Sequence, residues 1–385
     1  METPKETERT AVITGFGLVT SAGSGGAAAW ERLQAAVPSG VAWTPDGEEP
    51  SYLAAVIPDD YRAHPEIPRN LIHFLDRGAL IAMDAALQAV ESAGLGPGAG
   101  DARRFAVADG LAYRAPGQAT LFVPYGHTIA RTLGMRGPVL ELGGAEASGL
   151  AAIVAARQLI TSGQADVVVA GAAQGLQRPL LEHLRTQGIS SREPGRPFDV
   201  SHAGATPAEA AAYVVVEEAT HARARGAPAL ARIAGAATLF DPLAEPLATS
   251  DATESGRLMQ DILSDAGYLQ NQVDLALSCA DGRHGVDFAE GYGIKRIFGT
   301  HAYYLTVSTV MGALGWPIAA TGPLSVALAL ECMARGEIFP IAGFTTAEDD
   351  LDLAYAKAPR VEAVRCVLVT ALGLGGTNAG VLLER

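Results

Sequence analysis

The residues with the clearest chemical meaning lie in a glycine-rich turn around Glu146. The turn reads Gly143-Gly144-Ala145-Glu146-Ala147-Ser148-Gly149 and leads from a short apolar segment into an Ala-rich helix. The positive end of a helix dipole stabilises a carboxylate at such a place, which alone can explain a glutamate there. A carboxylate that accepted an acyl group would form an anhydride, a poor resting intermediate. Glu146 is therefore not expected to serve as a lasting nucleophile.

Three further segments carry polar or glycine-rich turns that could take part in chemistry. Asp281 lies in the turn Cys279-Ala280-Asp281-Gly282, and His284 follows three residues later. A loop histidine of this kind is usually polar surface, and the alternative is a displaced catalytic histidine. The other two segments are Ser308-Thr-Val-Met-Gly312-Ala313 and Leu372-Gly-Leu374-Gly-Gly-Thr-Asn378.

Several common site patterns are excluded. Gly15-Phe16-Gly17 follows a predicted strand, but the next glycine of a dinucleotide-binding fingerprint is missing, so a tight turn is the better interpretation. The sequence contains no P-loop, no HExxH and no GxSxG motif. We expect no cofactor and no metal ligand set.

Composition narrows the class of protein. The chain of 385 residues has a hydrophobic fraction of 49% and a net charge of −14, which argues against nucleic-acid binding. Its three cysteines are too few and too scattered for a disulfide framework or a zinc site. No apolar run is expected to reach the length of a membrane span, and Met1 to Thr10 lacks the apolar core of a signal peptide. These features predict a cytoplasmic protein with no membrane partner.

The elements that would position the turns alternate between strands and helices, as in a layered α/β fold. Strands are predicted at Ala11–Leu18, Phe105–Ala108, Asp166–Ala170, Tyr213–Val216, Leu230–Thr238, Leu275–Ser278, Tyr304–Val307, Cys366–Ala371 and Ala379–Leu383. Helices are predicted at Phe74–Ala93, Ser148–Ser162, Thr253–Ala266, Asp287–Phe298 and Pro323–Arg335. The same rhythm occurs twice, which indicates an internal duplication with halves at 1–227 and 228–385. No low-complexity linker separates them, so one compact body is expected.

Motifs along nearly the whole chain resemble the ketosynthases of the thiolase-like fold. The first strand and turn, Ala11 to Ser21, are similar to the start of that family. Arg196-Pro-Phe-Asp199 with Pro207-Ala-Glu209 is similar to its central "RPFD…GEGA" segment, and the Leu372–Asn378 segment is similar to "FGFGGTN". The resemblance implies an α/β, thiolase-like fold, with duplicated α/β halves forming a layered α-β-α-β-α sandwich.

The resemblance also implies that the catalytic residues have been replaced. Active members carry a Cys at the turn, where the helix N-terminus lowers its pKa for acyl transfer from a carrier protein; this chain carries Glu146. Asp281 stands for the first catalytic His, Ser308 for the Lys and Ala313 for the second His. Asp281 can only accept hydrogen bonds when ionised, and Ala313 offers none. No catalytic residue is expected, and the site should not condense.

Degenerate ketosynthases of this pattern resemble chain-length factors, the β subunits of type II polyketide ketosynthases. The resemblance implies a heterodimer with a catalytic ketosynthase α subunit and a polyketide tunnel along the shared interface. Acyl carrier proteins are usually acidic, so this acidic chain would meet one mainly through its partner. That subgroup usually carries Gln at the turn, and Glu146 departs from it.

A second departure is a short connection after Gly110. Only eleven residues, Leu111–Leu121, precede Phe122, where relatives carry a longer excursion with a helix. We predict tunnel or interface roles for Leu111, Ala112, Tyr113, Phe122, Tyr125 and for Leu374, which replaces the usual gating Phe. The shortened connection and Leu374 in place of the Phe both point away from the best-known aromatic products, toward alternatives such as a polyene.

Two rival hypotheses stay open. The chain could be a stand-alone malonyl-carrier-protein decarboxylase or acyltransferase that uses Glu146. It could also be a homodimer that sequesters acyl chains. Glu209, whose counterpart in active members is expected to face the Lys, would need a new partner, water or a proton, because an unpaired buried charge is costly.

Overall fold

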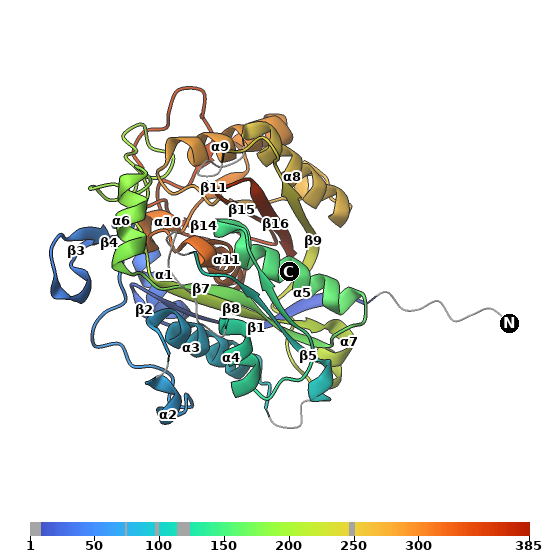
Figure 1. Cartoon of the computed structure of the whole chain (residues 1–385). Helices are drawn as coiled ribbons and strands as arrows, with labels where there is room; N and C mark the ends of the chain where they lie inside the picture. Colours follow the sequence, from blue (N-terminus) through green and yellow to red (C-terminus); the bar gives the residue numbers. More distant parts are fainter. Residues whose placement is uncertain (1–8, 74, 97–99, 114–123, 246–250) are drawn as a thin grey trace.

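Two α/β halves of the same topology form the molecule (Figure 1). The computed structural model describes residues 9–73, 75–96, 100–113, 124–245 and 251–385. The principal elements of the first half are β1 (Ala11–Thr20), α3 (Arg77–Ser92), β5 (Phe105–Gly110), α4 (Tyr125–Thr132), β6 (Val139–Leu142), α5 (Ser148–Thr161), β7 (Val167–Gln174) and β8 (Ala210–Glu218). Those of the second half are β9 (Ala231–Phe240), α8 (Ala252–Ala266), β10 (Leu275–Leu277), α9 (His284–Phe298), β11 (Thr306–Ser308), α11 (Thr321–Arg335), β15 (Cys366–Leu372) and β16 (Thr377–Glu384).

The duplication is visible strand by strand. The first half has the strand order β1-β8-β7-β5-β6, and the second half repeats it as β9-β16-β15-β10-β11. In each half the first two pairings are antiparallel and the next two are parallel. The halves meet where β1 pairs with β9 over Val12↔Arg232 and Ile13↔Ala231. The proposed division at residues 227 and 228 falls between α7 (Ala219–Ala224) and β9, and it stays a prediction.

Helices and strands stack in five layers, as the predicted sandwich requires. α3 and α4 cover the outer face of the first half, and α8 covers that of the second, with α9 packed against it. α5 and α11 lie between the two sets of strands, because each contacts strands of both halves. The N-terminal ends of these two central helices hold the turns around Glu146 and Trp316.

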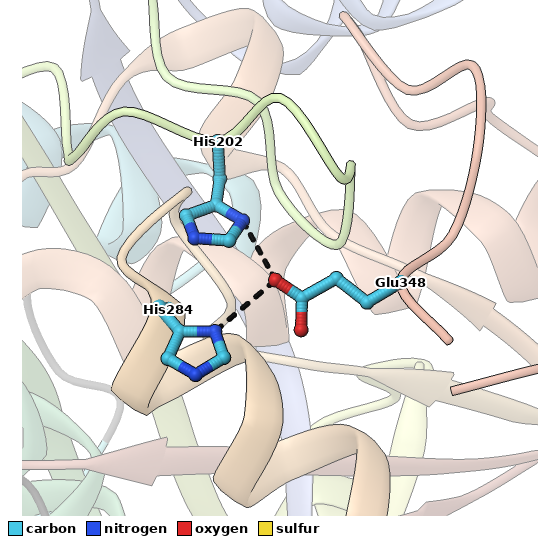
Figure 2. A group of neighbouring side chains, drawn as sticks. All are labelled: His202, His284 and Glu348. Atoms are coloured by element: carbon cyan, nitrogen blue, oxygen red, sulfur yellow. Dashed lines mark hydrogen bonds and ion pairs between the residues drawn. The ribbon is translucent and has the colours of Figure 1, made fainter. Parts of the chain in front are cut away.

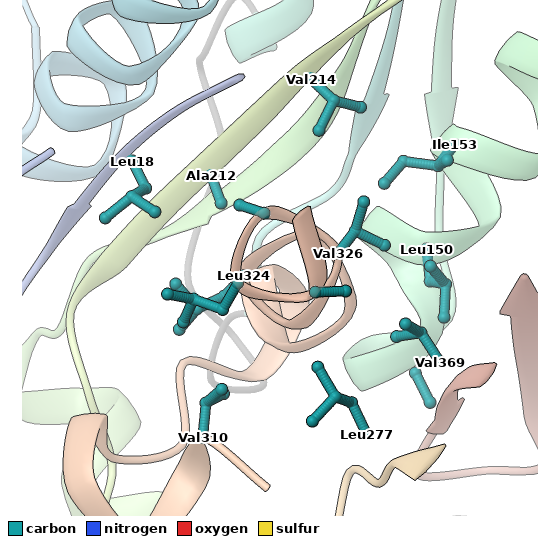
Figure 3. Packing of buried hydrophobic residues seen from close by; sticks show 14 of the residues in the cluster. Leu18, Leu150, Ile153, Ala212, Val214, Leu277, Val310, Leu324, Val326 and Val369 are labelled. Carbon is teal, nitrogen blue, oxygen red and sulfur yellow. The ribbon is translucent and has the colours of Figure 1, made fainter. Parts of the chain in front are cut away.

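Helix α11 is enclosed by both halves of the molecule. Figure 3 shows it end-on, with apolar side chains from both halves around it: Leu18, Leu150, Ile153, Ala212, Val214, Leu277, Val310 and Val369. Contrary to the sequence expectation, Ile318–Arg335 is long and apolar enough to cross a membrane by length and composition alone. Since 83% of this segment is buried inside the protein, its apolar character is explained by its place in the core.

All the strands and helices predicted from the sequence are present, with shifted ends. α3 begins at Arg77 because the Asp76 side chain caps it by accepting from the Ala79 N–H at 2.7 Å; Phe74 lies outside the described residues. α9 begins three residues before the predicted Asp287, and β11 begins two residues after Tyr304. The remaining elements are β2 (Gly23–Ser24), α1 (Gly26–Gln34), β3 (Val41–Trp43), β4 (Tyr52–Ala54), α2 (Arg69–Ile72), α6 (Arg178–Thr186), α10 (Met311–Leu314), β12 (Glu337–Ile338), β13 (Ala354–Tyr355) and β14 (Arg360–Val361).

Candidate functional site

Glu146 lies in a strained turn at the entrance to α5. Ala145 has φ of 49°, in the left-handed region that costs a non-glycine residue roughly 1–2 kcal/mol. Gly144 before it has φ of 151°, and a Cβ there would meet Thr377 Cγ2 at 2.9 Å. Such strain persists only where the surrounding structure enforces it, and it gathers at functional sites. The turn directs Glu146 inward, where its side chain is buried.

Arg283 joins the two acidic residues among the predicted site positions, Glu146 and Asp281. Its Nη2 donates to Glu146 Oε1 at 2.7 Å and to Asp281 Oδ2 at 2.6 Å. Its Nε donates to both carboxylate oxygens of Asp281, at 3.1 and 2.9 Å. The guanidinium also lies over the ring of Trp316, 4.3 Å from the ring centre, in a cation–π contact. We call Glu146, Arg283 and Asp281 the buried triad.

The second oxygen of Glu146 is occupied as well. Its Oε2 accepts the backbone N–H of Leu374 at 2.8 Å. Burial raises the pKa of Glu146 above its ordinary value, although the charge of Arg283 and the Leu374 N–H oppose that rise. Burial lowers the pKa of Arg283, but Asp281 and Glu146 raise it more, and the net pKa is well above its usual range. The triad is thus held together by a permanently charged guanidinium.

Asp287 fixes the turn that carries Asp281 and Arg283. Its two oxygens accept the backbone N–H groups of Phe198, Asp281 and Gly282 at 2.7, 3.1 and 3.2 Å. Burial and the neighbouring Asp281 charge raise the pKa of Asp287 well above its ordinary value. Asp281 Oδ1 in turn accepts the backbone N–H of Arg283 at 3.0 Å, so the turn positions its own salt bridge.

The other two replaced positions are buried and bonded elsewhere. Ser308 ends β11, and its Oγ donates to the carbonyl of Phe339 at 2.9 Å. Ala313 is fully buried in α10. The neighbouring Thr309 links this segment to the Asp281 turn, because its Oγ1 donates to the Ala280 carbonyl at 2.9 Å. The side chains of Ser308 and Ala313 therefore add no described contact to the buried triad.

Cys279 is the thiol nearest to the triad in sequence, and it is no substitute nucleophile. Its side chain is buried, and its Sγ accepts the Leu372 N–H at 3.3 Å. Burial, with help from Glu290, raises the pKa of this thiol well above its ordinary value. Because the thiolate is the reactive form, Cys279 is held unreactive.

The predicted tunnel residues divide into separate places. Ala112, Tyr113 and Tyr125 line a small pocket beside Gln174, whose side chain pairs with the Tyr113 backbone at 2.9 and 3.0 Å. Burial and the charge of Glu146 raise the pKa of Tyr113, so this pocket lies within electrostatic reach of the triad. Leu111 is exposed, and Phe122 lies outside the described residues. Leu374 contacts Glu146 through its backbone instead.

Glu209 and His284 have partners away from the triad. Glu209 Oε2 pairs with Arg77 Nε at 2.7 Å and accepts the Ile57 N–H at 3.2 Å. Of the three possibilities expected for Glu209 (a new partner, water or a proton), the structure shows a new partner. His284 is exposed at the first turn of α9 and contacts Glu348. It lies on the outer side of the turn whose inner side carries Arg283.

Arg283 was missed by the sequence analysis. It belongs to no family motif quoted for this chain, and it is one of 28 basic residues. One signal was available: two carboxylates expected in one buried site need a compensating cation, because an unpaired buried charge is costly. An arginine two residues after Asp281 was the nearest candidate.

Comparisons with known proteins agree with this architecture. The family model described as "Beta-ketoacyl synthase, N-terminal domain" matches residues 8–222. The model described as "Beta-ketoacyl synthase, C-terminal domain" matches residues 230–345. Nodulation protein E of Rhizobium leguminosarum bv. trifolii is 30% identical over 412 residues, which cover 97% of this chain and 98% of that protein. The tetracenomycin polyketide synthase ketoacyl synthase alpha subunit of Streptomyces glaucescens is 27% identical over 419 residues, covering 99% and 98% of the two chains.

A solved structure of the ishigamide ketosynthase/chain length factor has a TM-score of 0.87 to this chain at 23% identity, covering 98% of this chain and 99% of that one. At this identity the likeness demonstrates the fold. The aligned lengths of 412 and 419 exceed the 385 residues of this chain. Part of the length of those relatives therefore has no counterpart here, in keeping with a shortened connection.

Proposed function

The chain belongs to the β-ketoacyl synthase family, and from this we propose that it is a non-catalytic, chain-length-factor subunit. In this proposal it pairs with an active ketosynthase and shapes the channel that limits the length of a polyketide. The observation that carries the proposal is the buried triad. In the proposal, a cation and two carboxylates occupy the place where the resemblance implies that an active member holds an acyl group.

The triad supports inactivity in two ways. Both oxygens of Glu146 are engaged, one by Arg283 and one by the Leu374 N–H, so the carboxylate is not free to attack a thioester or to steer a malonyl group. Decarboxylative condensation also needs donors that stabilise developing negative charge and manage a proton. Asp281 is engaged by Arg283 and Ala313 has no polar side chain. The rival roles that depend on Glu146 would require the triad to open.

The retained scaffold supports a structural role. The site keeps a strained turn at Ala145, a loop fixed by Asp287 and a cation–π contact between Arg283 and Trp316. An ordered site without catalytic residues is consistent with a structural role. Ala112 and Tyr113 at the start of the shortened connection and Tyr125 after its end line one pocket, which makes them the best candidates for channel or interface residues. The heterodimer is supported by a neighbour of the same fold described as a ketosynthase/chain length factor.

Charge favours a division of labour between the subunits. The net charge of −14 makes this chain a poor surface for an acidic acyl carrier protein. In the proposal, carrier protein docks mainly on the catalytic partner. This chain then contributes to the channel and to the interface.

The decisive experiment compares the purified chain with the co-purified pair. The chain is expressed alone and together with the ketosynthase of its source organism, and each sample receives malonyl carrier protein. We expect a stable heterodimer by size exclusion, product only from the pair, and no carbon dioxide release from the chain alone. Decarboxylation by the lone chain that Glu146→Ala abolishes would establish the rival enzyme. A stable homodimer that refuses the ketosynthase would establish the sequestering protein.

The channel role has its own test within the pair. Tyr113→Ala should shift the length of the product, whereas Tyr304→Ala, on an exposed side chain, should leave it unchanged. Equal product profiles for both variants and the unmodified pair would remove Tyr113 from the channel.

A further inference from the structure

Two histidines and a glutamate converge on the surface behind the Asp281 turn. Figure 2 shows His202 and His284 with their rings side by side and the Glu348 carboxylate directed between their Nδ1 atoms. Glu348 Oε1 lies 2.8 Å from His202 Nδ1 and 3.1 Å from His284 Nδ1. The imidazole planes are 15° apart with centroids 5.1 Å from each other. One ligand atom of each residue lies within 4.8 Å of the others.

The backbone around this group is built to hold it. Asp199 Oδ2 accepts the Thr345 N–H at 2.6 Å and the Thr346 N–H at 2.9 Å. Its Oδ1 accepts the Ser201 N–H at 2.9 Å. Asp199 thus ties the loop that contains His202 to the loop that contains Glu348. His284 is held independently at the first turn of α9.

The donor spacing suits a divalent ion. Ligands about 2.0–2.1 Å from zinc, at angles between octahedral and tetrahedral, are roughly 2.9–3.4 Å apart. The two His–Glu separations of 2.8 and 3.1 Å are close to this range, and the ligand atoms of the two histidines lie within 4.8 Å of each other. Two imidazoles with one carboxylate form a donor set that favours zinc and its transition-metal neighbours over magnesium or calcium, which prefer oxygen ligands.

The charged and polar groups around His202 and Glu348 mainly favour a bound cation. Without an ion, the single Nδ1 position of His202 faces two acceptors, Glu348 Oε1 and the Asp199 carbonyl oxygen at 3.0 Å. A cation at this place would accept lone pairs from His202 Nδ1 and from both oxygens. Asp349 and Asp350 follow Glu348 directly and add negative charge nearby. The positive end of the α9 dipole opposes a cation, and the Glu348 carboxylate offsets it.

We propose that His202, His284 and Glu348 form a binding site for a zinc-class divalent ion, with solvent completing the coordination. The ion joins three segments: the loop after Asp199, the start of α9 and the loop before Leu351. His284 directly follows Arg283, so the bound ion fixes the outer side of the turn whose inner side forms the buried triad. The three positions are scattered in sequence and form no recognisable ligand motif, so no metal site was predicted.

The test uses the full chain without an affinity tag, stripped with a chelator and dialysed. Calorimetric titration with Zn²⁺ should give one ion per chain, and Co²⁺ should give the visible absorption of a nitrogen- and oxygen-ligated ion. His202→Ala, His284→Ala and Glu348→Gln should each weaken Zn²⁺ binding by at least about tenfold. Mg²⁺ at the same concentration should not compete.

A matched control is available in the His127–Glu141 pair, with Nδ1 to Oε1 at 3.1 Å and a comparably exposed imidazole. His127→Ala should leave the Zn²⁺ affinity unchanged. Circular dichroism of each metal-free variant checks that the fold is kept, and Glu348→Gln preserves the shape of the site if an alanine variant unfolds. Absence of 1:1 binding, or an equal loss in His127→Ala and Glu348→Gln, would overturn the proposal. Neither result would bear on the chain-length role, which the heterodimer assay tests separately.

Discussion

At the scale of single residues, the arrangement around Arg283 makes a quantitative prediction. Arg283→Met keeps the apolar stem but leaves Glu146 and Asp281 buried without their cation. Removing one partner of a buried ionic group typically costs about 3–5 kcal/mol, because the remaining charges are uncompensated. The free energy of unfolding, measured in urea, should fall by that amount.

Arg335→Met is the matched control for this prediction. Arg335 also lies over an indole, Trp30, at 4.9 Å and pairs with a carboxylate, Glu331, at 2.7 Å. Its side chain is 38% exposed, against 12% for Arg283, so its loss should cost only about 1 kcal/mol or less. Equal losses in the two variants would show that Glu146 and Asp281 do not depend on Arg283.

The same residues show how far sequence alone could go. The sequence singles out Glu146 and Asp281 because each stands where the resemblance implies a catalytic residue, among neighbours that match the family motifs. Arg283 matches no motif, and its role arises only when the fold brings residues 146 and 283 together. His202 and Glu348 could not be paired in advance, since their contact depends on loops fixed by Asp199.

At the scale of elements, two neighbouring strands make stability depend on pH. Asp109 in β5 and Glu141 in β6 are register partners. Burial raises the pKa of Glu141 to about 7, and burial with the Glu141 charge raises that of Asp109 well above its ordinary value. The folded chain therefore binds more protons than the unfolded chain between the ordinary glutamate pKa and about 7. Stability should fall as pH rises through this window.

Unfolding in urea at several pH values checks this dependence. Glu141→Gln removes one carboxyl of the pair and should flatten the decline up to pH about 7. Glu31→Gln, on an exposed side chain of α1, should keep the decline of the unmodified chain. A decline that persists unchanged in Glu141→Gln would assign it to other groups.

The close packing of α5 against α11 gives a second prediction at the scale of elements. A Cβ at Gly149 would lie 2.5 Å from Pro323 Cγ and 2.6 Å from the Ala319 carbonyl oxygen. Gly149→Ala should therefore destabilise the protein by about 1–3 kcal/mol through overpacking. Gly285→Ala, in α9 with no atom within 4 Å of the added Cβ, should be neutral or stabilise by up to about 1 kcal/mol. Thermal unfolding of both variants makes the comparison, and equal shifts would contradict it.

Element types were predictable because their patterns are local, whereas their ends depend on particular contacts. α3 begins where Asp76 caps it, and β11 begins late because a 3-10 turn, Gly299–Tyr303, precedes it. α11 had the composition of a membrane span because both sets of strands enclose it. Periodicity reports that a face is buried, but it does not report what buries it.

At the scale of the whole molecule, the two halves share one core. α5 of the first half contacts β16 of the second, and α11 of the second contacts β8 of the first. The strands themselves join over only two register pairs. We therefore predict a single cooperative unfolding transition, with calorimetric and van't Hoff enthalpies in agreement. Two resolved transitions in scanning calorimetry would show that the halves fold as separate domains.

The buried triad also limits the effect of placing a cysteine at position 146. A cysteine restored at position 146 would face a guanidinium still bound to Asp281, which would favour its thiolate and expose it to oxidation. It would still lack the proton donors that condensation needs at positions 281 and 313. Under the proposed function, Glu146→Cys alone would therefore give a reactive thiol without condensation, because Asp281, Ser308 and Ala313 would still stand where the resemblance implies the two His and the Lys. For a chain with the proposed role, selection would act on the shape of the surfaces that form the channel and the interface, because no single substitution would supply condensing activity.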